Sequence, residues 1–424
     1  MAGAHHPVPP RNDDPGWAVR RSTEQEYPEF AAVFSEAIGL PVEKLLHEER
    51  DFPSAEYDRA LVALDGERII GTTMAYSLTL TVPGGPRRAA GITAVGVWPT
   101  YRRRGVLSAL MRRQLADIRE RGEKLAVLWS SEGTIYGRFG YGPAVRQFEA
   151  SVQLAHAALR PGAPRDPALT VDLTEPGSVR GELEELHRRA ASARNGHILR
   201  KPGWWGWLLH DEERDRRGAG PLRAAVVRGP DGAEGYALYR VLHKWEDRLP
   251  TGEVRVRETV AATARARVAL YDHLFSRDLA SSAHLDNLAE DDILTVLLAD
   301  PRRLARRDFD SLWVRLVDLP GALAERSYAT TLDTVLEVTD RFAPWNAGRW
   351  RLRAGGGEAR AEAAADAAPD LTLDASHLGA VYLGGGSLTA FVDAGLAVEH
   401  APGAAARLDT ALHVPRAPLC TTDF

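Results

Sequence analysis

The sequence predicts an α/β (α+β) protein in which helices pack on mixed β-sheets, and three observations support this fold class. Apolar residues recur at helical spacing in some segments and run continuously or alternate in others, so helices and strands are interleaved. Two successive segments share one order of elements: helix, antiparallel strands, a further strand and a second helix. A chain of 424 residues is long enough for two to four domains, each able to bury a core.

Composition divides the chain into an arm and three domains. Residues 1–17 are rich in Pro, His and Asp and are expected to form a flexible N-terminal arm. The first domain is expected at residues 18–160, the second at 165–304 and the third at 308–424. A stretch rich in proline separates the first domain from the second.

The first domain is expected to open with a helix and an antiparallel hairpin. Residues 24–38 have apolar side chains at helical spacing. Residues 61–64 and 69–82 are rich in strand-forming residues, and the pair Asp65-Gly66 between them favours a tight hairpin turn. These segments therefore predict one helix and two antiparallel strands.

The rest of the first domain alternates strands and helices. Residues 91–98 form the next expected strand, and residues 105–121 form an amphipathic helix that ends at Gly122. The short apolar run 125–129 predicts a buried strand. Residues 134–139 are expected to form one or two helical turns.

The second domain repeats this order at low sequence similarity. A helical stretch around Leu183 is followed by expected strands at 222–227, 236–241 and 254–262, and then by a helix at 264–275. The third domain combines strands with short helices. Its expected strands are 312–317, 331–338 and a weak one within 354–368, and its expected helices are 375–382, 388–391 and 404–412.

Charge and composition exclude several classes of function. The net charge of −5 argues against a nucleic-acid partner and suits a cationic substrate. No apolar run approaches 18 residues and the N-terminus lacks the apolar core of a signal peptide, so no membrane association is expected. The single cysteine, Cys420, excludes an internal disulfide and fits a cytoplasmic location. The histidines show no metal-ligand spacing, so no metal is expected.

Residues 95–108 carry the most informative pattern. A strand ends at Trp98-Pro99, a turn with three arginines follows, and a long helix begins at once. The first N–H groups of a helix have no partner within it, so this end attracts anions. Gly105 would let a phosphate approach the backbone, and at least one arginine could reach it. The alternative is a solvated basic turn. A nucleotide-binding P-loop is excluded because no Gly-Lys-Ser/Thr follows.

The strand before this turn offers a second binding element. The backbone groups of Val95, Gly96 and Val97 could pair with an extended ligand arm, as an added strand would. Glycine is unusual inside a strand, so Gly96 indicates a bulge or a close backbone approach. The alternative for Gly96 is a simple packing accommodation.

Two motifs resemble known families. The pattern of a strand, Val-x-Val-x-Pro, Arg-x-x-Gly and a helix resembles the acetyl-CoA motif of the GNAT superfamily of N-acetyltransferases. Residues 131–143 (Ser-Glu-Gly-Thr-Ile-Tyr-Gly-Arg-Phe-Gly-Tyr-Gly-Pro) resemble the segment that marks the enhanced intracellular survival (Eis) proteins of actinobacteria. Residues 235–241, 312–315 and 381–384 resemble further family positions, so the resemblance covers essentially the whole chain.

The resemblance to the Eis family implies an architecture and an assembly. It implies two tandem GNAT-like folds, the second without a cofactor site, followed by a domain similar to sterol carrier protein. The sequence agrees for the second fold, because residues 263–266 (Thr-Ala-Arg-Ala) run into a helix with no Arg-x-x-Gly turn. The resemblance also implies a homohexamer.

The resemblance further implies the reaction. The co-substrate would be acetyl-CoA, and the acceptor a cationic amine such as an aminoglycoside, a polyamine or a lysine side chain. The amine would attack directly in a ternary complex. The implied cofactor-binding residues are Val95, Gly96, Val97, Arg103, Arg104, Gly105, Val106, Leu107, Ser108, Ser131 and Glu132. Leu107 departs from the superfamily, where Gly or Ala is usual, but Eis-type proteins tolerate a bulky residue there.

Two residues are the candidates for catalysis. A tyrosine hydroxyl stays protonated at neutral pH and can donate to a leaving thiolate, and the resemblance puts the general acid on Tyr136. The alternative is that Tyr136 only packs on the sheet. The resemblance puts the general base on the C-terminal carboxylate, here that of Phe424, although termini are usually disordered. Asp423 and Glu36 could line an acidic acceptor pocket, and the N–H of Val97 could serve the oxyanion.

A different class of function is also open. The sterol-carrier-like domain could bind a lipid or another ligand, with the first fold vestigial. The Arg/Gly turn and Tyr136 favour the enzyme.

Overall fold

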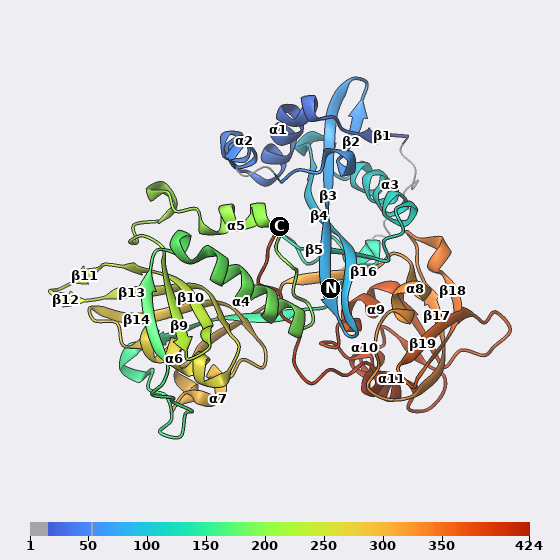
Figure 1. Ribbon diagram of the computed structural model, residues 1–424. Helices are drawn as coiled ribbons and strands as arrows, with labels where there is room; N and C mark the ends of the chain where they lie inside the picture. The colour runs from blue at the N-terminus through green and yellow to red at the C-terminus, as the bar shows by residue number, and fades with distance from the viewer. Residues whose placement is uncertain (1–15, 52–53) are drawn as a thin grey trace, which may run out of the picture. The chain divides into compact units, whose positions relative to one another are not determined.

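The computed structural model describes residues 16–51 and 54–424, which form two compact units (Figure 1). The first unit holds the described residues up to Ser77 together with Ala90–Gly122. The second unit holds Leu78–Ala89 and Glu123–Phe424. The two long strands that leave the first unit therefore enter the second before the chain returns.

The predicted N-terminal arm, residues 1–17, lies outside the described residues except for Gly16 and Trp17. Across the described part of the chain, none of the helices combines the length and the hydropathy of a bilayer-spanning segment.

The first unit is a sheet with helices on both faces. Its strands lie in the order β1 (Ala18–Arg21), β2 (Leu61–Asp65), β3 (Arg68–Val82) and β4 (Gly85–Val97), and its helices are α1 (Tyr27–Ile38), α2 (Val42–Asp51) and α3 (Val106–Glu120). Helix α1 packs on the face that carries Val62 and Ile69. Helix α3 packs on the face that carries Leu61 and Ile70, because successive strand residues point to opposite faces.

In this unit the hairpin forms as predicted, and the first helix starts later than predicted. The hairpin turn is confirmed: Asp65 pairs with Arg68, and Gly66 has the positive φ of 61° that a tight turn needs. The helix predicted from residue 24 begins instead at Tyr27, because Thr23 and Glu26 form a capping box around a short 3-10 turn.

The second unit contains β5 (Leu125–Trp129) and β6 (Gly142–Pro143), which belong to the predicted first domain, and a distant strand, β16 (Leu312–Leu316), that pairs with both of them. Strand β5 pairs antiparallel with β16, which in turn pairs with β6. The local pattern placed the strand at 312–317 in the third domain, but its partner is the strand of the first domain. Long-range pairing of this kind leaves no mark in local periodicity, so the structure alone reveals it.

The large sheet of the second unit has seven strands with α4 and α6 on opposite faces (Figure 1). Leu183 of α4 packs with Tyr236 and Leu238, while Leu270 of α6 packs with Tyr239 on the other face. Its strands, in order, are β15 (Ala305–Asp310), β7 (Arg146–Gln153), β14 (Ala280–Ala289), β13 (Gly252–Ala261), β10 (Gly232–Leu242), β9 (Arg223–Gly229) and β8 (Thr170–Thr174); its helices are α4 (Arg180–Ala193), α5 (Pro202–Leu209), α6 (Ala264–Phe275) and α7 (Leu294–Leu297). Strands β11 (Trp245–Glu246) and β12 (Leu249–Pro250) form a separate two-stranded sheet.

The last part of the chain forms a third sheet with short helices (Figure 1, orange to red). The strands, in order, are β19 (Glu358–Ala363), β18 (Gly348–Gly355), β17 (Leu332–Thr339), β20 (Leu371–Asp374) and β21 (Val398–Glu399). The helices are α8 (Leu319–Ala324), α9 (Ala375–Val381), α10 (Leu388–Asp393) and α11 (Ala404–Leu412). The predicted α/β class with helices on mixed sheets is confirmed.

Candidate functional site

The candidate phosphate-binding turn lies in the first unit, between β4 and α3. The backbone N–H of Trp98 bonds to the carbonyl of Ile70 (2.9 Å), which ends the strand, and a 3-10 turn over Pro99–Tyr101 follows. Arg103 and Gly105 then adopt left-handed backbone conformations, with φ of 60° and 84°. This reversal starts α3 at Val106, so strand, turn and helix occur in the predicted order.

The N-terminus of α3 has the features of an anion site. Its N-cap is Gly105, which has no side chain to accept from the first N–H groups of this 15-residue helix. Those groups belong to Val106, Leu107 and Ser108, and the first bond within the helix is donated by Ala109 to the Gly105 carbonyl (3.0 Å). Unpaired N–H groups and the helix dipole both favour an anion here.

The three arginines of the turn have different surroundings within their unit. Arg102 donates to the carbonyl of Ala37 (2.7 Å), and Arg104 lies over the ring of Tyr101, 4.7 Å from its centroid. Arg103 is exposed and takes part in no hydrogen bond, ion pair or ring contact with other residues that the structure describes. Arg103 is therefore the arginine that can turn to a ligand at least cost.

Strand β4 is irregular just before the turn. Ala94 has a positive φ of 50°, and its carbonyl accepts a hydrogen bond from the Thr72 hydroxyl (2.9 Å). A Cβ on Gly96 would lie 3.0 Å from the Cβ of Ala37 and 3.2 Å from the Cα of Phe34. These distances favour close packing of Gly96 against α1 over a bulge at Gly96. The unusual backbone angle in this part of the strand is that of Ala94. Val95 and Val97 flank Gly96 and are half-buried.

Tyr136 lies in the second unit, on the turn that follows β5. Its side chain is 7% exposed and packs edge-to-face on Tyr141, with ring centroids 6.0 Å apart. Its carbonyl accepts from the N–H groups of Phe139 (3.0 Å) and Tyr141 (3.3 Å), which close the turn. Ser131 and Glu132 are exposed at the start of this turn. The one or two helical turns predicted at 134–139 reduce to a 3-10 segment at Gly137–Phe139.

Burial changes the acidity of Tyr136. Removal from water disfavours the phenolate and, with a smaller contribution from the negative charge of Glu132, raises the pKa of Tyr136 to about 12. The hydroxyl is therefore protonated throughout the neutral range.

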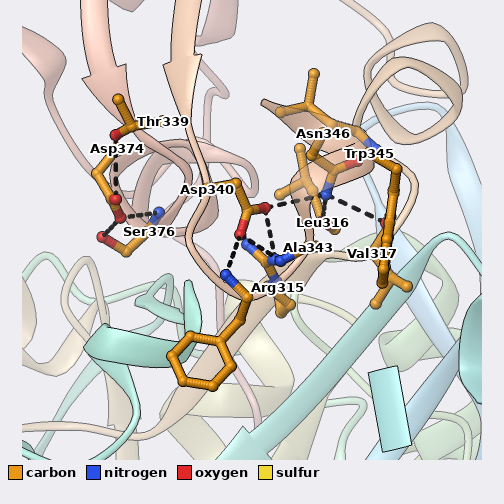
Figure 2. A network of polar contacts seen from close by, with 12 residues as sticks. Arg315, Leu316, Val317, Thr339, Asp340, Ala343, Trp345, Asn346, Asp374 and Ser376 are labelled. Atoms are coloured by element: carbon orange, nitrogen blue, oxygen red, sulfur yellow. Dashed lines mark hydrogen bonds and ion pairs between the residues drawn. The ribbon is translucent and has the colours of Figure 1, made fainter. Parts of the chain in front are cut away.

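A buried polar network lies beneath this turn (Figure 2). Arg315 of β16 donates to the carboxylate of Asp340 (2.6 Å), and both side chains are excluded from solvent. Figure 2 shows Asn346 on the other side of the same carboxylate, where it donates at 3.2 Å and also bonds to the carbonyl of Leu316 (3.0 Å). Nearby, Asp374 caps α9 by accepting from the N–H of Ser376 (2.9 Å).

Gly140 and Gly142 of the segment 131–143 fit against this network and against α9. A Cβ on Gly140 would lie 2.0 Å from Nη1 of Arg315, and Gly140 also has a positive φ of 82°. A Cβ on Gly142 would lie 2.0 Å from the carbonyl oxygen of Ser376, and one on Gly379 would lie 2.2 Å from the carbonyl oxygen of Val314. The motif therefore holds the Tyr136 turn tightly against β16 and the start of the third sheet's helices.

The C-terminal tail is bound along much of its length within the second unit. The N–H of Leu419 bonds to the Asn195 carbonyl (2.9 Å). The indole N–H of Trp129, the last residue of β5, donates to the carbonyl of Thr422 (3.1 Å). Phe424 stacks on Trp204, with ring centroids 6.4 Å apart. The tail thus contacts the end of the strand that leads into the Tyr136 turn.

The predicted site residues therefore form two groups. Val95, Gly96, Val97, Arg103, Arg104, Gly105, Val106, Leu107 and Ser108 gather in the first unit, and Ser131, Glu132, Tyr136 and Phe424 belong to the second. Sequence reasoning did not identify Trp129, Arg200 and Arg315. Arg315 belongs to residues 312–315, which resemble a family position but gave no indication of its contacts. Arg200 has no motif around it, and the nearby tryptophans Trp204, Trp205 and Trp207 are the one local signal.

The second fold has no comparable turn. The N-terminus of α6 is capped by the Thr263 hydroxyl, which accepts from the N–H of Ala266 (3.1 Å). The carboxylate of Glu234 accepts from the same hydroxyl (3.1 Å) and pairs with Arg265 (3.0 Å). The start of α6 is thus capped by a side chain, whereas the N-cap of α3 is a glycine without one.

One cluster in the described residues has the composition of a metal site. Atoms of His210, Glu212 and Asp215 lie within 4.8 Å of one another. Glu212 is already paired with Arg214 (2.5 Å) and His210 (3.3 Å), and the cluster lies at the surface. Exposed acidic clusters of this kind need no ion, so the expectation of no metal stays a prediction.

Comparison with family models identifies all three parts of the chain. Residues 18–144 and 196–316 each match a model of an acetyltransferase (GNAT) domain, and residues 319–421 match a sterol carrier protein domain. The predicted architecture of two tandem GNAT-like folds and a sterol-carrier-like domain is confirmed.

Curated relatives and solved structures agree with these matches. An uncharacterized N-acetyltransferase of Streptomyces avermitilis is 42% identical over 86% of this chain and 88% of its own length. The N-acetyltransferase Eis of Mycobacterium tuberculosis is 37% identical over 77% of this chain and 80% of its own length. The crystal structure of Eis1 from Mycobacterium abscessus has a TM-score of 0.81 and 34% identity, covering 96% of this chain and all of that one. These matches, together with the donor-type turn and the Tyr136 motif, show that the chain belongs to the Eis family of GNAT acyltransferases and carries out N-acetyl transfer.

Proposed function

We propose that the protein transfers acetyl from acetyl-CoA to an amine of a cationic acceptor by direct attack in a ternary complex, with Tyr136 as general acid and the C-terminal carboxylate of Phe424 as general base. The observation that carries this proposal is the bond between Trp129 and Thr422, because it attaches the chain end to the strand that leads into the Tyr136 turn. In this proposal the donor turn, Tyr136 and the Phe424 carboxylate take part in one reaction.

The donor would be held by its phosphates and its extended arm. The pyrophosphate would lie on the N–H groups of Val106, Leu107 and Ser108, with Arg103 and Arg104 supplying positive charge. The pantetheine arm would pair with the backbone around Val95 and Val97. Ser131 and Glu132 are proposed as further contacts to acetyl-CoA from the Tyr136 turn.

The pKa of Tyr136 defines what it can contribute. A phenol with a pKa of about 12 is a weaker acid than a thiol, whose pKa is near 8.5. Full proton transfer to a free thiolate would therefore be uphill. The hydroxyl acts best as a hydrogen-bond donor that stabilises negative charge on sulfur as the bond to carbon breaks.

The carboxylate of Phe424 would receive or hold the acceptor's ammonium. A terminal carboxyl has a pKa near 3.5, whereas an alkyl ammonium has one near 10. Direct deprotonation is therefore unfavourable, and the carboxylate is proposed to orient the ammonium and to assist its proton loss through water. The exposed carboxylate of Asp423 beside it adds negative charge for a cationic acceptor such as an aminoglycoside, a polyamine or a lysine. A homohexamer is proposed on the family resemblance.

The proposed role of the terminal carboxylate can be tested by converting it to a carboxamide. Semisynthesis would give two proteins of identical sequence, one ending in the Phe424 carboxylate and one in its carboxamide. We expect kcat to fall at least about a hundredfold in the carboxamide, within the range typical of a lost acid–base group. Acetyl-CoA affinity, measured by calorimetry, should stay unchanged. An Asp423→Asn variant with the native carboxylate controls for loss of local charge, and a carboxamide with full turnover would exclude the terminal base.

A further inference from the structure

We propose that Arg200 is a positioning residue that fixes the end of the C-terminal tail, with Glu258 and Tyr236 of the second GNAT-like fold holding Arg200 in place. This inference rests on the proposed role of Phe424, because it explains how the terminal carboxylate would be held. It also gives the second fold, which has lost its donor site, a part in the reaction.

The tail and the second sheet meet at Arg200. The guanidinium donates through Nε to the hydroxyl of Thr422 (3.1 Å) and through Nη2 to the carbonyl of Thr421 (3.0 Å). The same guanidinium also donates to the carboxylate of Glu258 on β13, through Nη1 (3.0 Å) and Nη2 (2.6 Å). One side chain therefore connects two residues at the chain end with the central strands of the sheet.

Glu258 is itself fixed. The hydroxyl of Tyr236 on β10 donates to Oε2 of Glu258 at 2.8 Å. Burial alone would raise the pKa of Glu258, but the adjacent charge of Arg200 outweighs burial and lowers that pKa to about 2. The carboxylate is thus ionised at any pH at which the enzyme would work, and Arg200 keeps its partner.

Burial of this ion pair calls for an explanation beyond stability. The side chains of Arg200 and Glu258 are each only 3% exposed. Taking both charges out of water costs about as much as their attraction returns, so buried pairs are often no more stable than apolar residues of the same shape. We propose that this pair instead fixes the orientation of the Arg200 guanidinium. That guanidinium binds Thr421 and Thr422, which directly precede the proposed catalytic terminus.

The surroundings favour a rigid attachment. Arg200 lies over the ring of Trp205, 5.1 Å from its centroid, and Trp205 is buried. The carbonyl of Thr422 is held independently by Trp129 (3.1 Å). Thr422 is thus bound through its hydroxyl by the second fold and through its carbonyl by the end of β5, which defines its position from two sides.

The matched pair Thr422→Val and Thr422→Ser tests the attachment. Valine has the shape of threonine without the hydroxyl that accepts from Arg200, whereas serine keeps that hydroxyl. Arg200→Lys keeps the charge but removes the planar fork. Arg228→Lys is the control, because Arg228 of β9 forms a similar fork with Glu182 of α4 at 2.5 and 3.1 Å, pairs also with Asp172 of β8 (2.7 Å), and makes no hydrogen bond or ion pair with Thr421 or Thr422.

Two measurements separate positioning from mere stability. The first is release of Phe424 by carboxypeptidase, followed by intact mass, which reports tail attachment without any need for activity. The second is kcat beside the acetyl-CoA dissociation constant. We expect Arg200→Lys and Thr422→Val to release Phe424 about tenfold faster and to lose about tenfold in kcat at unchanged acetyl-CoA affinity. Thr422→Ser and Arg228→Lys should match the parent in both.

The outcomes distinguish this inference from the proposed function. Unchanged release of Phe424 in Arg200→Lys and Thr422→Val would overturn the role of Arg200, even if the carboxamide protein is inactive. Faster release with unchanged kcat would overturn positioning for the reaction and would count against the terminal base as well. If Arg200→Lys does not fold, the isosteric threonine pair decides alone.

Discussion

Tyr136 illustrates how a single residue's surroundings set its chemistry. The sequence identifies the residue through its motif, but only the structure shows that the ring is nearly enclosed and that burial raises the pKa of its hydroxyl to about 12. That value limits the residue to its protonated form, so its deprotonation cannot produce the basic limb of a pH–rate profile below about pH 11.

The variant Tyr136→Phe tests this role. We expect a fall in kcat of about a hundredfold or more, because the proposed hydrogen bond to the departing sulfur would stabilise charge that develops in the transition state. Acetyl-CoA affinity should change less than twofold by calorimetry, since the ring and its packing on Tyr141 remain. Phe139→Leu, in the same turn, controls for disturbed packing. Turnover of Tyr136→Phe equal to that of the parent would remove the hydroxyl from the mechanism.

Two glycines of the same motif give a matched prediction for stability. Gly140 has a positive φ, and a Cβ there would overlap the Arg315 guanidinium, whereas a Cβ on Gly137 meets no atom within 4 Å. Gly140→Ala should lose about 3 kcal/mol of unfolding free energy from backbone strain and overpacking together. Gly137→Ala should change it by less than about 1 kcal/mol. Denaturant titration measures both, and equal losses would contradict the packing described for Arg315.

At the scale of elements, the start of α3 was readable from sequence while the pairing of strands was not. The order strand, turn and helix at residues 95–108 follows from local signals: Pro99, Gly105 and the apolar spacing of α3. The short helix α2 (Val42–Asp51) was missed because its residues are mostly charged and none is buried. The pairing of β16 with β5 depends on contacts across distant sequence, which no local pattern encodes.

The N-terminus of α3 gives a prediction for donor binding. Arg103→Gln should weaken acetyl-CoA about tenfold, the effect of one lost charge-assisted hydrogen bond, and the loss should shrink as salt rises. Arg113→Gln is the control, because Arg113 lies on the same helix but pairs with Asp117 at 2.7 Å. Calorimetry at two salt concentrations measures the difference. Equal affinities for both variants would place the phosphates elsewhere.

At the scale of the whole molecule, the candidate site could be predicted only in part. Motifs predict the donor turn and Tyr136, and the family resemblance predicts Phe424. The polar residues around them, such as Arg200, Glu258 and Arg315, are single residues brought together by folding. The sequence around Arg200 and Glu258 does not separate them from the many surface arginines and glutamates of this chain, and the resemblance of residues 312–315 to family positions does not reveal what Arg315 contacts.

Buried histidines predict how the stability of the molecule depends on pH. Burial, followed by the nearby charge of Arg200, lowers the pKa of His187 to about 4, and burial lowers that of His197 as well. Between pH 6.5 and about 4 the unfolded chain therefore binds protons that the folded chain does not, so stability falls as pH falls through this range. For His187 the full effect is on the order of 3 kcal/mol.

The variant His187→Gln checks this assignment. The midpoint of urea unfolding should fall less steeply from pH 6.5 to 4.5 than in the parent, although the variant starts from lower stability. His156→Gln, at an exposed position, is the matched control. Parallel pH curves for His187→Gln and the parent would show that another group titrates.

The pairing of β5 with β16 also bears on how the protein is made. About 180 residues separate Trp129 from its partner Leu312. At a synthesis rate of 5–20 residues per second, one edge of β5 waits roughly 10 to 40 s on the ribosome before its partner exists. An unpaired apolar edge is a template for aggregation during that interval. Truncation before Leu312 would make that exposure permanent, so a shortened N-terminal domain should need either β16 grafted onto it or a chaperone to stay in solution.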